Sequence, residues 1–266
     1  MNGVVLKDSE FALFQKMIYE TAGINMSPAK KALVGGRLAK RVKHFGLSSY
    51  GEYFKMLGNP ANGEFQTAVD LLTTNETFFF REQRHFDFLR DKVLPLWRIG
   101  PRRVWSAASS SGEEAYTLAM LLAEHVGTSD WEIIGTDIST RVLDKARRGH
   151  YPMERSKNIP ETYLKKYCLK GVGAQEGTFL IAKELRTRVS FMHANLKTEL
   201  RQLGSFDVIF LRNVLIYFDI QTKQDVVSKV VQRLKPGGYL MVGHSESLNG
   251  VTTAVNVILP SVYQKT

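Results

Sequence analysis

A run of small side chains that ends in two carboxylates is the first group of residues that could do chemistry. It reads Ser106-Ala107-Ala108-Ser109-Ser110-Ser111-Gly112-Glu113-Glu114. Small residues let a backbone loop approach a ligand closely, and a helix that begins behind them suits a nucleotide or nucleoside. The run lacks the G-x-G-x-x-G spacing of dinucleotide enzymes and the lysine of a P-loop. A carboxylate at Glu113 would repel a pyrophosphate and attract an amino or sulfonium group. The alternative is an ordinary serine-capped helix with an acidic first turn.

Polar side chains recur after two later apolar runs. Asp137 follows one of them and suits a ribose diol, as in a dinucleotide site without the phosphates; the alternative is a helix cap. Arg212, Asn213 and Tyr217 follow another and look like a substrate face, with a buried ion pair and a core tyrosine as the alternative. Both positions therefore remain candidates for ligand contacts.

A third candidate segment is Thr74-Asn75-Glu76-Thr77-Phe78-Phe79-Phe80-Arg81-Glu82. Three consecutive phenylalanines cannot all face one core in a regular helix. Either the segment is a lid over a ligand, with Asn75, Thr77 and Arg81 reaching inward, or it is a hinge that plugs a domain junction.

Two kinds of periodicity indicate the elements that must position these residues. The first 58 residues carry apolar side chains at helical spacing and predict a helical N-terminal domain. The turn-rich stretch Asn59-Pro60-Ala61-Asn62-Gly63 places a linker at residues 59–74, and residues 75–266 form the second domain.

In the second domain, predicted strands alternate with predicted helices. The strands are 103–107, 131–135, 206–211 and 239–242, and the helices are 113–126, 139–148 and 221–234, the last one stopped by Lys235-Pro236-Gly237-Gly238. This alternation predicts an α/β fold with a mostly parallel, doubly wound, Rossmann-like sheet, in which ligands bind outside the carboxyl ends of the strands. A glycine-punctuated stretch at about 168–193, with short strands at 178–181 and 188–191, predicts a small antiparallel β-subdomain inserted in that sheet.

Five segments together resemble the chemotaxis receptor methyltransferases, the CheR family. They are residues 75–81, 107–114, 136–138, 212–218 and 243–247, which stand in the family's order and spacing over nearly the whole chain. The resemblance implies a small all-helical N-terminal domain on a class I S-adenosylmethionine-dependent methyltransferase domain with an antiparallel subdomain. It also implies methyl transfer from S-adenosylmethionine to glutamate side chains of bacterial chemoreceptors, which leaves S-adenosylhomocysteine.

Matching positions carry the family's cofactor contacts onto this chain. The resemblance assigns Asn75, Thr77 and Arg81 to the methionine portion of the cofactor and the closing segment. It assigns Glu113 to the cofactor amino group and Asp137 to the ribose hydroxyls.

The remaining contacts come from the second half of the chain. By the same matching, Asn195 and Leu196 lie near the adenine. Leu211 and Arg212 line the methionine end, and Tyr217 lies close to the reacting sulfur.

The implied reaction needs no general base. A glutamate carboxylate with an ordinary pKa of about 4.3 is already ionised at neutral pH, so the enzyme's task is in-line positioning and removal of water. We expect Arg81 or Arg212 to orient the incoming carboxylate and Tyr217 to shape the attack. His244 is then a structural or pocket-lining histidine, and no metal site is expected.

A basic helix near the N-terminus predicts a docking surface. Residues 21–51 contain no aspartate or glutamate, and Arg37, Lys40, Arg41 and His44 share one predicted helical face. Acidic methylation helices of receptors fit this face by family expectation. Nucleic acid is the competing partner, but the patch lacks interleaved aromatic side chains for base stacking.

Composition limits the remaining alternatives. The chain has 266 residues, a net charge of +10, 44% hydrophobic residues and a single cysteine, which indicates a globular protein without an internal disulfide. With no apolar run of membrane-spanning length and no signal-peptide pattern, we expect a cytoplasmic monomer. A receptor's C-terminal tethering peptide is a further partner expected at the β-subdomain. The rival functions are an RNA or small-molecule methyltransferase and a non-catalytic cofactor-binding adaptor.

Overall fold

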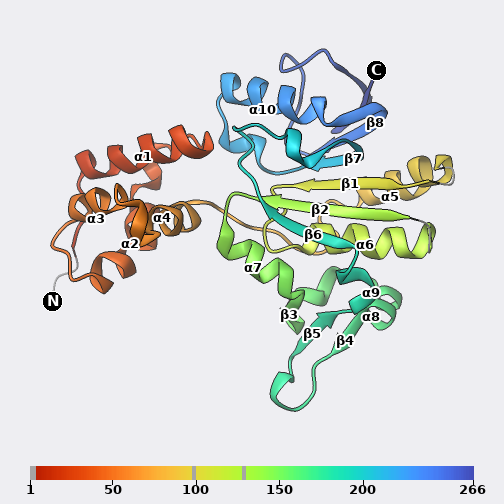
Figure 1. The fold of residues 1–266 in the computed structure, drawn as a ribbon, viewed down its shortest axis with the longest axis horizontal. Coiled ribbons are helices and arrows are strands. Elements are labelled where there is room, and N and C mark those ends of the chain that lie inside the picture. Colours follow the sequence, from red (N-terminus) through yellow and green to blue (C-terminus); the bar gives the residue numbers. More distant parts are fainter. Residues whose placement is uncertain (1–3, 98–99, 128–129) are drawn as a thin grey trace.

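The computed structural model describes residues 4–97, 100–127 and 130–266. They form a helical lobe and a sheet lobe, with a small extra sheet projecting from the latter (Figure 1). The helical lobe consists of α1 (Asp8–Ala22), α2 (Lys31–His44), α3 (Tyr50–Leu57) and α4 (Glu64–Leu72). The predicted apolar stripes meet in one core, where Phe14, Ile18 and Leu38 are fully buried. The expected helical N-terminal domain is thus confirmed.

Helix α4 lies inside the stretch that the sequence assigned to the linker. Ala68, Val69 and Leu72 are buried in the core of the helical lobe, so residues 64–72 belong to that lobe and not to a linker spanning 59–74. The turn-rich residues predicted a break correctly, but the break is short. Gly63 adopts a left-handed φ of 67° and starts α4 directly.

The same helix joins the helical lobe to the sheet lobe. The Asp70 carboxylate accepts hydrogen bonds from the Thr140 backbone N at 3.0 Å and from its Oγ1 at 2.8 Å, at the first residue of α7 (Thr140–Arg148). A carboxylate at a helix N-terminus satisfies free backbone N–H groups and complements the helix dipole. Gln66 Nε2 donates to the Ile138 carbonyl at 2.9 Å. The helical lobe is therefore bonded to the residues that directly follow Asp137.

A seven-stranded sheet forms the centre of the second lobe. Its strands, in spatial order, are β6 (Val189–His193), β2 (Trp131–Asp137), β1 (Arg102–Ala107), β7 (Phe206–Leu211), β8 (Leu234–Val242), β10 (Val262–Lys265) and β9 (Val255–Leu259). The first five are parallel, whereas β10 is antiparallel to both of its neighbours. The order reverses at β1, so the predicted doubly wound α/β fold of class I methyltransferases is confirmed.

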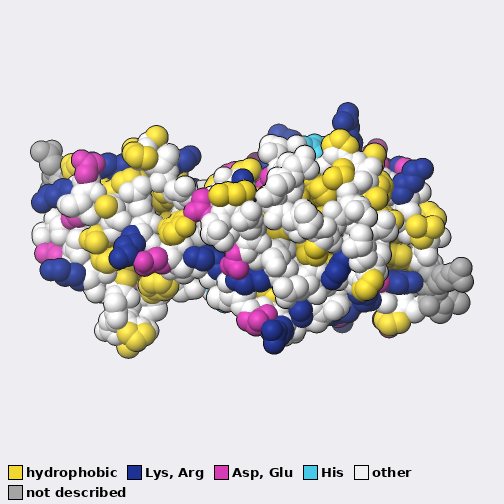
Figure 2. Space-filling view, turned by 90° about the horizontal axis from the view of Figure 1, so that it is seen from above, with side chains coloured by type: hydrophobic (Ala, Val, Ile, Leu, Met, Phe, Trp, Pro, Cys, Tyr) yellow, Lys and Arg dark blue, Asp and Glu magenta, His cyan; other side chains and the backbone are white. Residues whose placement is uncertain are grey.

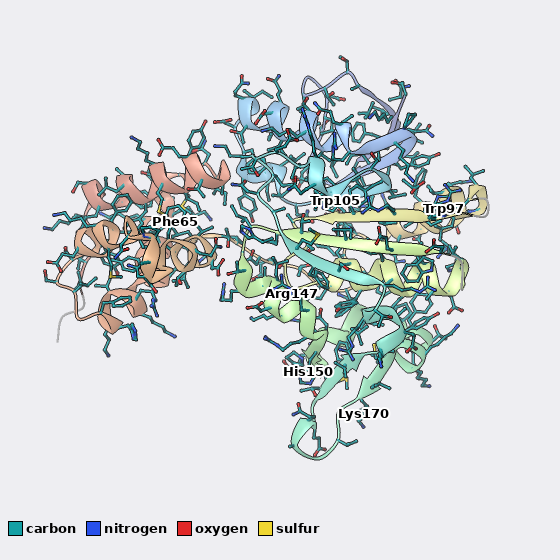
Figure 3. The ribbon with its side chains drawn as sticks, viewed as in Figure 1. Phe65, Trp97, Trp105, Arg147, His150 and Lys170 are labelled. Carbon is teal, nitrogen blue, oxygen red and sulfur yellow. The ribbon has the colours of Figure 1, made fainter. Side chains whose placement is uncertain are left out.

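Alternation along the strands supplies one core on each face of the sheet. Val104, Ile133 and Val208 face the layer that contains α6 (Glu113–His125), and Trp105 and Ile134 face the layer of α10 (Ile220–Gln232). The two helices lie on opposite sides of the sheet in Figure 1, and the Trp105 side chain lies inside the lobe (Figure 3). Burial on both faces explains why β7 is a continuous apolar run.

The inserted subdomain differs from its predicted limits of about 168–193. Its sheet consists of β3 (His150–Pro152), β5 (Thr178–Ile181) and β4 (Cys168–Lys170), all antiparallel. His150 and Lys170 mark it in Figure 3. Residues 188–191 were predicted to belong to it, but β6 pairs in parallel with β2 and is the edge of the main sheet. A short strand does not reveal from sequence which sheet it joins, because pairing partners are distant.

Shorter helices complete the chain. They are α5 (Arg84–Phe88), α8 (Glu161–Tyr167) and α9 (Lys183–Arg186). The Lys235–Gly238 stretch was expected to separate α10 from a strand at 239, but β8 already begins at Leu234 and runs through it, with a register shift against β7. Among the described residues, no helix combines the length and the apolar character that a membrane span requires.

Candidate functional site

A cavity lies between the two lobes, at the carboxyl ends of β1, β2 and β7. Figure 2 shows the two lobes meeting at a narrow waist. Eight predicted site residues line the cavity, namely Asn75, Thr77, Arg81, Asp137, Asn195, Leu196, Arg212 and Tyr217. The topology brings them together because the carboxyl ends of parallel strands share one edge of the sheet.

The loop after β1 approaches the cavity closely and holds Asp137 in place. Ala108 and Ser110 adopt positive φ values of 58° and 50°, which makes a tight turn. The Ser110 backbone N donates to Asp137 Oδ2 at 2.9 Å, and the Ser139 backbone N donates to Oδ1 at 2.9 Å. Burial raises the pKa of Asp137 to about 6 despite these bonds. A buried carboxylate fixed by backbone donors suits a ligand diol.

The two adjacent glutamates at the start of α6 point in different directions. Glu113 is 1% exposed, accepts from Ser111 Oγ at 2.7 Å, and does not line the cavity. Glu114 does line it, accepts from Ser106 Oγ at 2.6 Å, and pairs with Arg212 Nη1 at 3.5 Å. Burial raises the pKa of both carboxyls. Glu113 was expected at the cofactor amino group, but Glu114 is the one of the two that lines the cavity, because neighbouring side chains on a helix diverge by about 100°.

Arg212 is the most buried charge in the cavity wall. Its side chain is 1% exposed, lies 3.4 Å from Glu82 Oε2, and donates from Nη2 to the Arg81 carbonyl. The rings of Phe86 and Phe210 lie 5.4 Å and 5.7 Å from its guanidinium. Its Nε and Nη1 atoms are buried and lack a hydrogen-bond acceptor among the described residues. Buried donors are normally satisfied, so a ligand with acceptor oxygens fits here.

Residues 74–82, called the phenylalanine segment from here on, contribute both to the core of the sheet lobe and to the wall of the cavity. Phe79 and Phe80 are buried in the core beneath α6, and the Phe80 backbone N donates to Thr117 Oγ1 at 3.1 Å. Phe78 is 42% exposed and lines the cavity, with the Arg81 guanidinium 5.6 Å from its ring. Arg81 also donates to the Glu76 carbonyl at 2.8 Å, which holds the segment as a compact turn.

The residues after β6 and β7 contribute unequally. Asn195 lines the cavity and donates to the Thr21 carbonyl at 2.6 Å, and the Tyr217 carbonyl accepts from the Asn25 backbone N at 2.8 Å. Leu211 is fully buried in the core on the α10 face and does not line the cavity. It was expected at the methionine end of the cofactor, but strand alternation turns its side chain to the core and leaves the next residue, Arg212, at the cavity.

The helical lobe supplies part of the wall that sequence reasoning missed. Ile24, Asn25, Met26 and Leu33 line the cavity, although no motif marks them. Arg37 lines it too, and donates to the carbonyls of Leu72 and Thr73 at 3.1 Å and 3.0 Å. Their contribution depends on how the two lobes meet, which the sequence of either lobe alone does not show.

The four residues of the predicted docking face differ in their exposure to solvent. Arg37 lines the cavity and Arg41 pairs with the buried Glu64, so both guanidinium groups are only partly exposed and already have partners. Lys40 and His44 are exposed, as the docking prediction requires.

Known protein families match both lobes of the chain. The family described as "CheR methyltransferase, all-alpha domain" matches residues 9–73, and "CheR methyltransferase, SAM binding domain" matches residues 75–263. A chemotaxis protein methyltransferase of Escherichia coli is 42% identical, over 92% of this chain and 87% of its own. One from Salmonella typhimurium is 38% identical over 98% of this chain and 91% of its own. Chemotaxis protein methyltransferase 2 of Pseudomonas aeruginosa is 39% identical over 96% and 92%. The chain therefore belongs to the CheR family of S-adenosylmethionine-dependent methyltransferases.

Proposed function

We propose that this chain transfers a methyl group from S-adenosylmethionine to glutamate side-chain carboxylates of chemoreceptors in the cytoplasm. One observation carries the proposal: the cavity wall holds the buried Asp137 carboxylate, the partly buried Glu114 carboxylate and the buried Arg212 guanidinium, and none of the described residues lining it is a histidine. Such a wall suits a zwitterionic nucleoside cofactor and an acceptor that is already ionised. The names of the relatives support a chemotaxis substrate.

We assign the cofactor contacts by charge. Glu114 takes the cofactor amino group, and Arg212 takes the carboxylate with the donors that lack a protein acceptor. Asp137 accepts from the ribose hydroxyls, at the end of β2 where such acids act in related sheets. Asn195 and Leu196 border the adenine.

Asn75, Thr77 and Arg81 close the cavity over the methionine portion. When bound, the cofactor supplies an electrophilic methyl on a sulfonium.

The chain positions the acceptor and excludes water. Carboxylate and sulfonium lose their charges as the methyl moves, so a dry site favours the transition state. Arg212 is already paired with Glu82 and Glu114, which leaves Arg81 to orient the incoming carboxylate. Tyr217 faces the same space and limits the direction of attack. The three are the residues we assign to catalysis, with Arg212 acting through the cofactor.

We propose that an acidic receptor helix docks along α2. Lys30 and Leu33, at the start of this helix, line the cavity, and Lys40, Lys43 and His44 are exposed near its end. A helix bound along this surface would place one of its glutamates at the cavity mouth. Opposite charges on the two helices would mainly raise the association rate.

The function is tested by incubating the purified chain with chemoreceptor and S-adenosylmethionine carrying a labelled methyl group. We expect label in the receptor that mild alkali releases as methanol, because carboxyl esters hydrolyse under these conditions and methylated amines do not. Alkali-stable label, or label only in RNA or a small molecule, would contradict the proposal. Cofactor binding without any transfer would indicate a non-catalytic adaptor.

The correction at the start of α6 predicts different effects for two neighbouring substitutions. Glu114→Gln should weaken binding of S-adenosylhomocysteine by about tenfold or more, the effect of losing a charge-assisted hydrogen bond. Glu113→Gln, the matched control, should weaken it by less than about threefold, on the same scale. Calorimetric titration of both variants measures this, and the reverse ranking would restore Glu113 to the site.

Asp137 predicts a pH dependence of cofactor binding. Its pKa is raised to about 6 by burial, and only the ionised form accepts two hydrogen bonds from a diol. Affinity for S-adenosylhomocysteine should therefore be full above this pH and fall by up to about tenfold per unit below it. The Asp137→Asn variant should bind S-adenosylhomocysteine weakly at every pH and should not show this fall in affinity. Glu113 and Glu114 are neighbouring carboxyls whose pKa is also raised, so the variant is needed to assign the fall to Asp137. An unchanged fall in the variant would assign it to another group.

The docking proposal predicts a charge-specific effect on the receptor. Lys40→Glu should raise the KM for receptor about tenfold and leave the KM for S-adenosylmethionine unchanged, because repulsion replaces attraction at the α2 surface. Lys183→Glu makes the same charge change on the exposed surface of α9 and serves as the control. Equal receptor KM values for the two variants in the transfer assay would place the docking surface elsewhere.

A further inference from the structure

Three potential metal ligands meet behind the cavity wall, outside the cofactor site. They are Glu82 at the end of the phenylalanine segment, His85 at the start of α5, and His244 in the loop after β8. Their ligand atoms all lie within 4.8 Å of one another, and none of the three residues lines the cavity. The ring centroids of the two histidines are 4.7 Å apart.

The hydrogen bonds around His85 fix which ring nitrogen carries the proton. Ser261 Oγ donates to the Pro260 carbonyl at 2.6 Å, so its hydrogen is already used. The same oxygen lies 2.7 Å from His85 Nε2 and must accept there, which places the imidazole proton on Nε2. Nδ1 therefore carries a lone pair.

That lone pair faces another acceptor. His85 Nδ1 is buried, has no hydrogen-bond partner among the described residues, and lies 3.5 Å from Glu82 Oε2. Glu82 Oε2 accepts from the His244 backbone N at 3.2 Å, but Nδ1 of His85 has no donor of its own in the described part of the chain. Two acceptors that face each other repel, and an unsatisfied buried nitrogen destabilises the fold. A cation bound between them would take the lone pair of Nδ1 and remove the repulsion from Oε2.

We propose that Glu82 Oε2, His85 Nδ1 and His244 bind a divalent transition-metal ion of the zinc type. Two imidazoles and one carboxylate form a familiar three-residue ligand set for zinc. The bond from His85 Nε2 to Ser261 is the outer contact that orients a metal-binding imidazole. The exposed side of His244 leaves the fourth position open to solvent.

The geometry requires only a small contraction. Ligands about 2.0–2.2 Å from a tetrahedral ion are about 3.3–3.5 Å apart, so the pair formed by Glu82 and His85 already has the right separation. The ligand atom of His244 lies within 4.8 Å of the other two, on a side chain that is exposed to solvent.

Neighbouring charges are compatible with a cation at this position. The Arg212 guanidinium lies 3.4 Å from Glu82 Oε2, and its positive charge opposes a cation there. Arg212 also pairs with Glu114 at 3.5 Å, so it keeps a carboxylate partner if Glu82 binds the cation. Asn213 Nδ2 donates to Glu82 Oε1 at 3.0 Å and keeps the carboxylate in place. The ion would join the end of the phenylalanine segment to the loop after β8.

The test uses the untagged full chain, stripped with a chelator and titrated with zinc chloride in a calorimeter, without cofactor. We expect one zinc ion per chain, and a tetrahedral absorption spectrum when cobalt(II) is used instead. His244→Ala and Glu82→Gln should each weaken zinc binding by about tenfold or more, and a protein-stabilising effect of zinc on Tm should be lost with them. His125→Ala, which removes an exposed histidine on α6, is the control and should bind as the parent does.

The proposal would be overturned by either of two results. One is the absence of stoichiometric zinc binding to the parent chain. The other is binding that His244→Ala and Glu82→Gln leave unchanged, which would place the ion elsewhere. Because His244 is exposed, its replacement keeps the fold, and a cooperative thermal transition verifies this.

Discussion

The burial of the Arg212 guanidinium is the constraint on which the rest of the site depends. A charge taken out of water destabilises the fold by several kcal/mol unless carboxylates and hydrogen-bond acceptors surround it. Glu82 and the Arg81 carbonyl supply these from the end of the phenylalanine segment, and Glu114 supplies another carboxylate from the start of α6. One side chain at the end of β7 thus fixes two separate segments of the cavity wall. Its Nε and Nη1 atoms lack hydrogen-bond acceptors among the described residues, and under the proposed function the cofactor carboxylate supplies them.

The second requirement is contact between the lobes. The helical lobe is bonded to the sheet lobe through Asp70 at the N-terminus of α7 and through Asn25 at the Tyr217 carbonyl. Arg37 ties α2 to the chain that leads into the phenylalanine segment. These contacts give the N-terminal helices two tasks, because the same α2 that borders the cavity also displays Lys40 to solvent. Under the proposed function, the surface that recognises the receptor and the wall that encloses the cofactor are parts of one helix.

Patterns local in sequence predicted most of the fold and part of the site. Continuous apolar runs such as β7 identified the parallel sheet, and acids at strand ends placed Asp137 at the cavity. The sequence could not distinguish Glu113 from Glu114, because that choice depends on the rotation of α6 against the sheet. It likewise assigned Arg37 to the outer surface, since the contact of Arg37 with the end of α4 joins residues that are distant in sequence. The pairing of β6 with the main sheet was missed for the same reason.

The most direct test of this account is a crystal structure of the chain with S-adenosylhomocysteine. We expect the ligand between the lobes, with its amino group within hydrogen-bond distance of Glu114, its carboxylate on Arg212 and its ribose hydroxyls on Asp137. That arrangement would show that the buried guanidinium organises the cofactor site. A ligand bound in the reverse orientation, with adenine beside Arg212, or a ligand held by Glu113 with Arg212 still lacking acceptors, would contradict it.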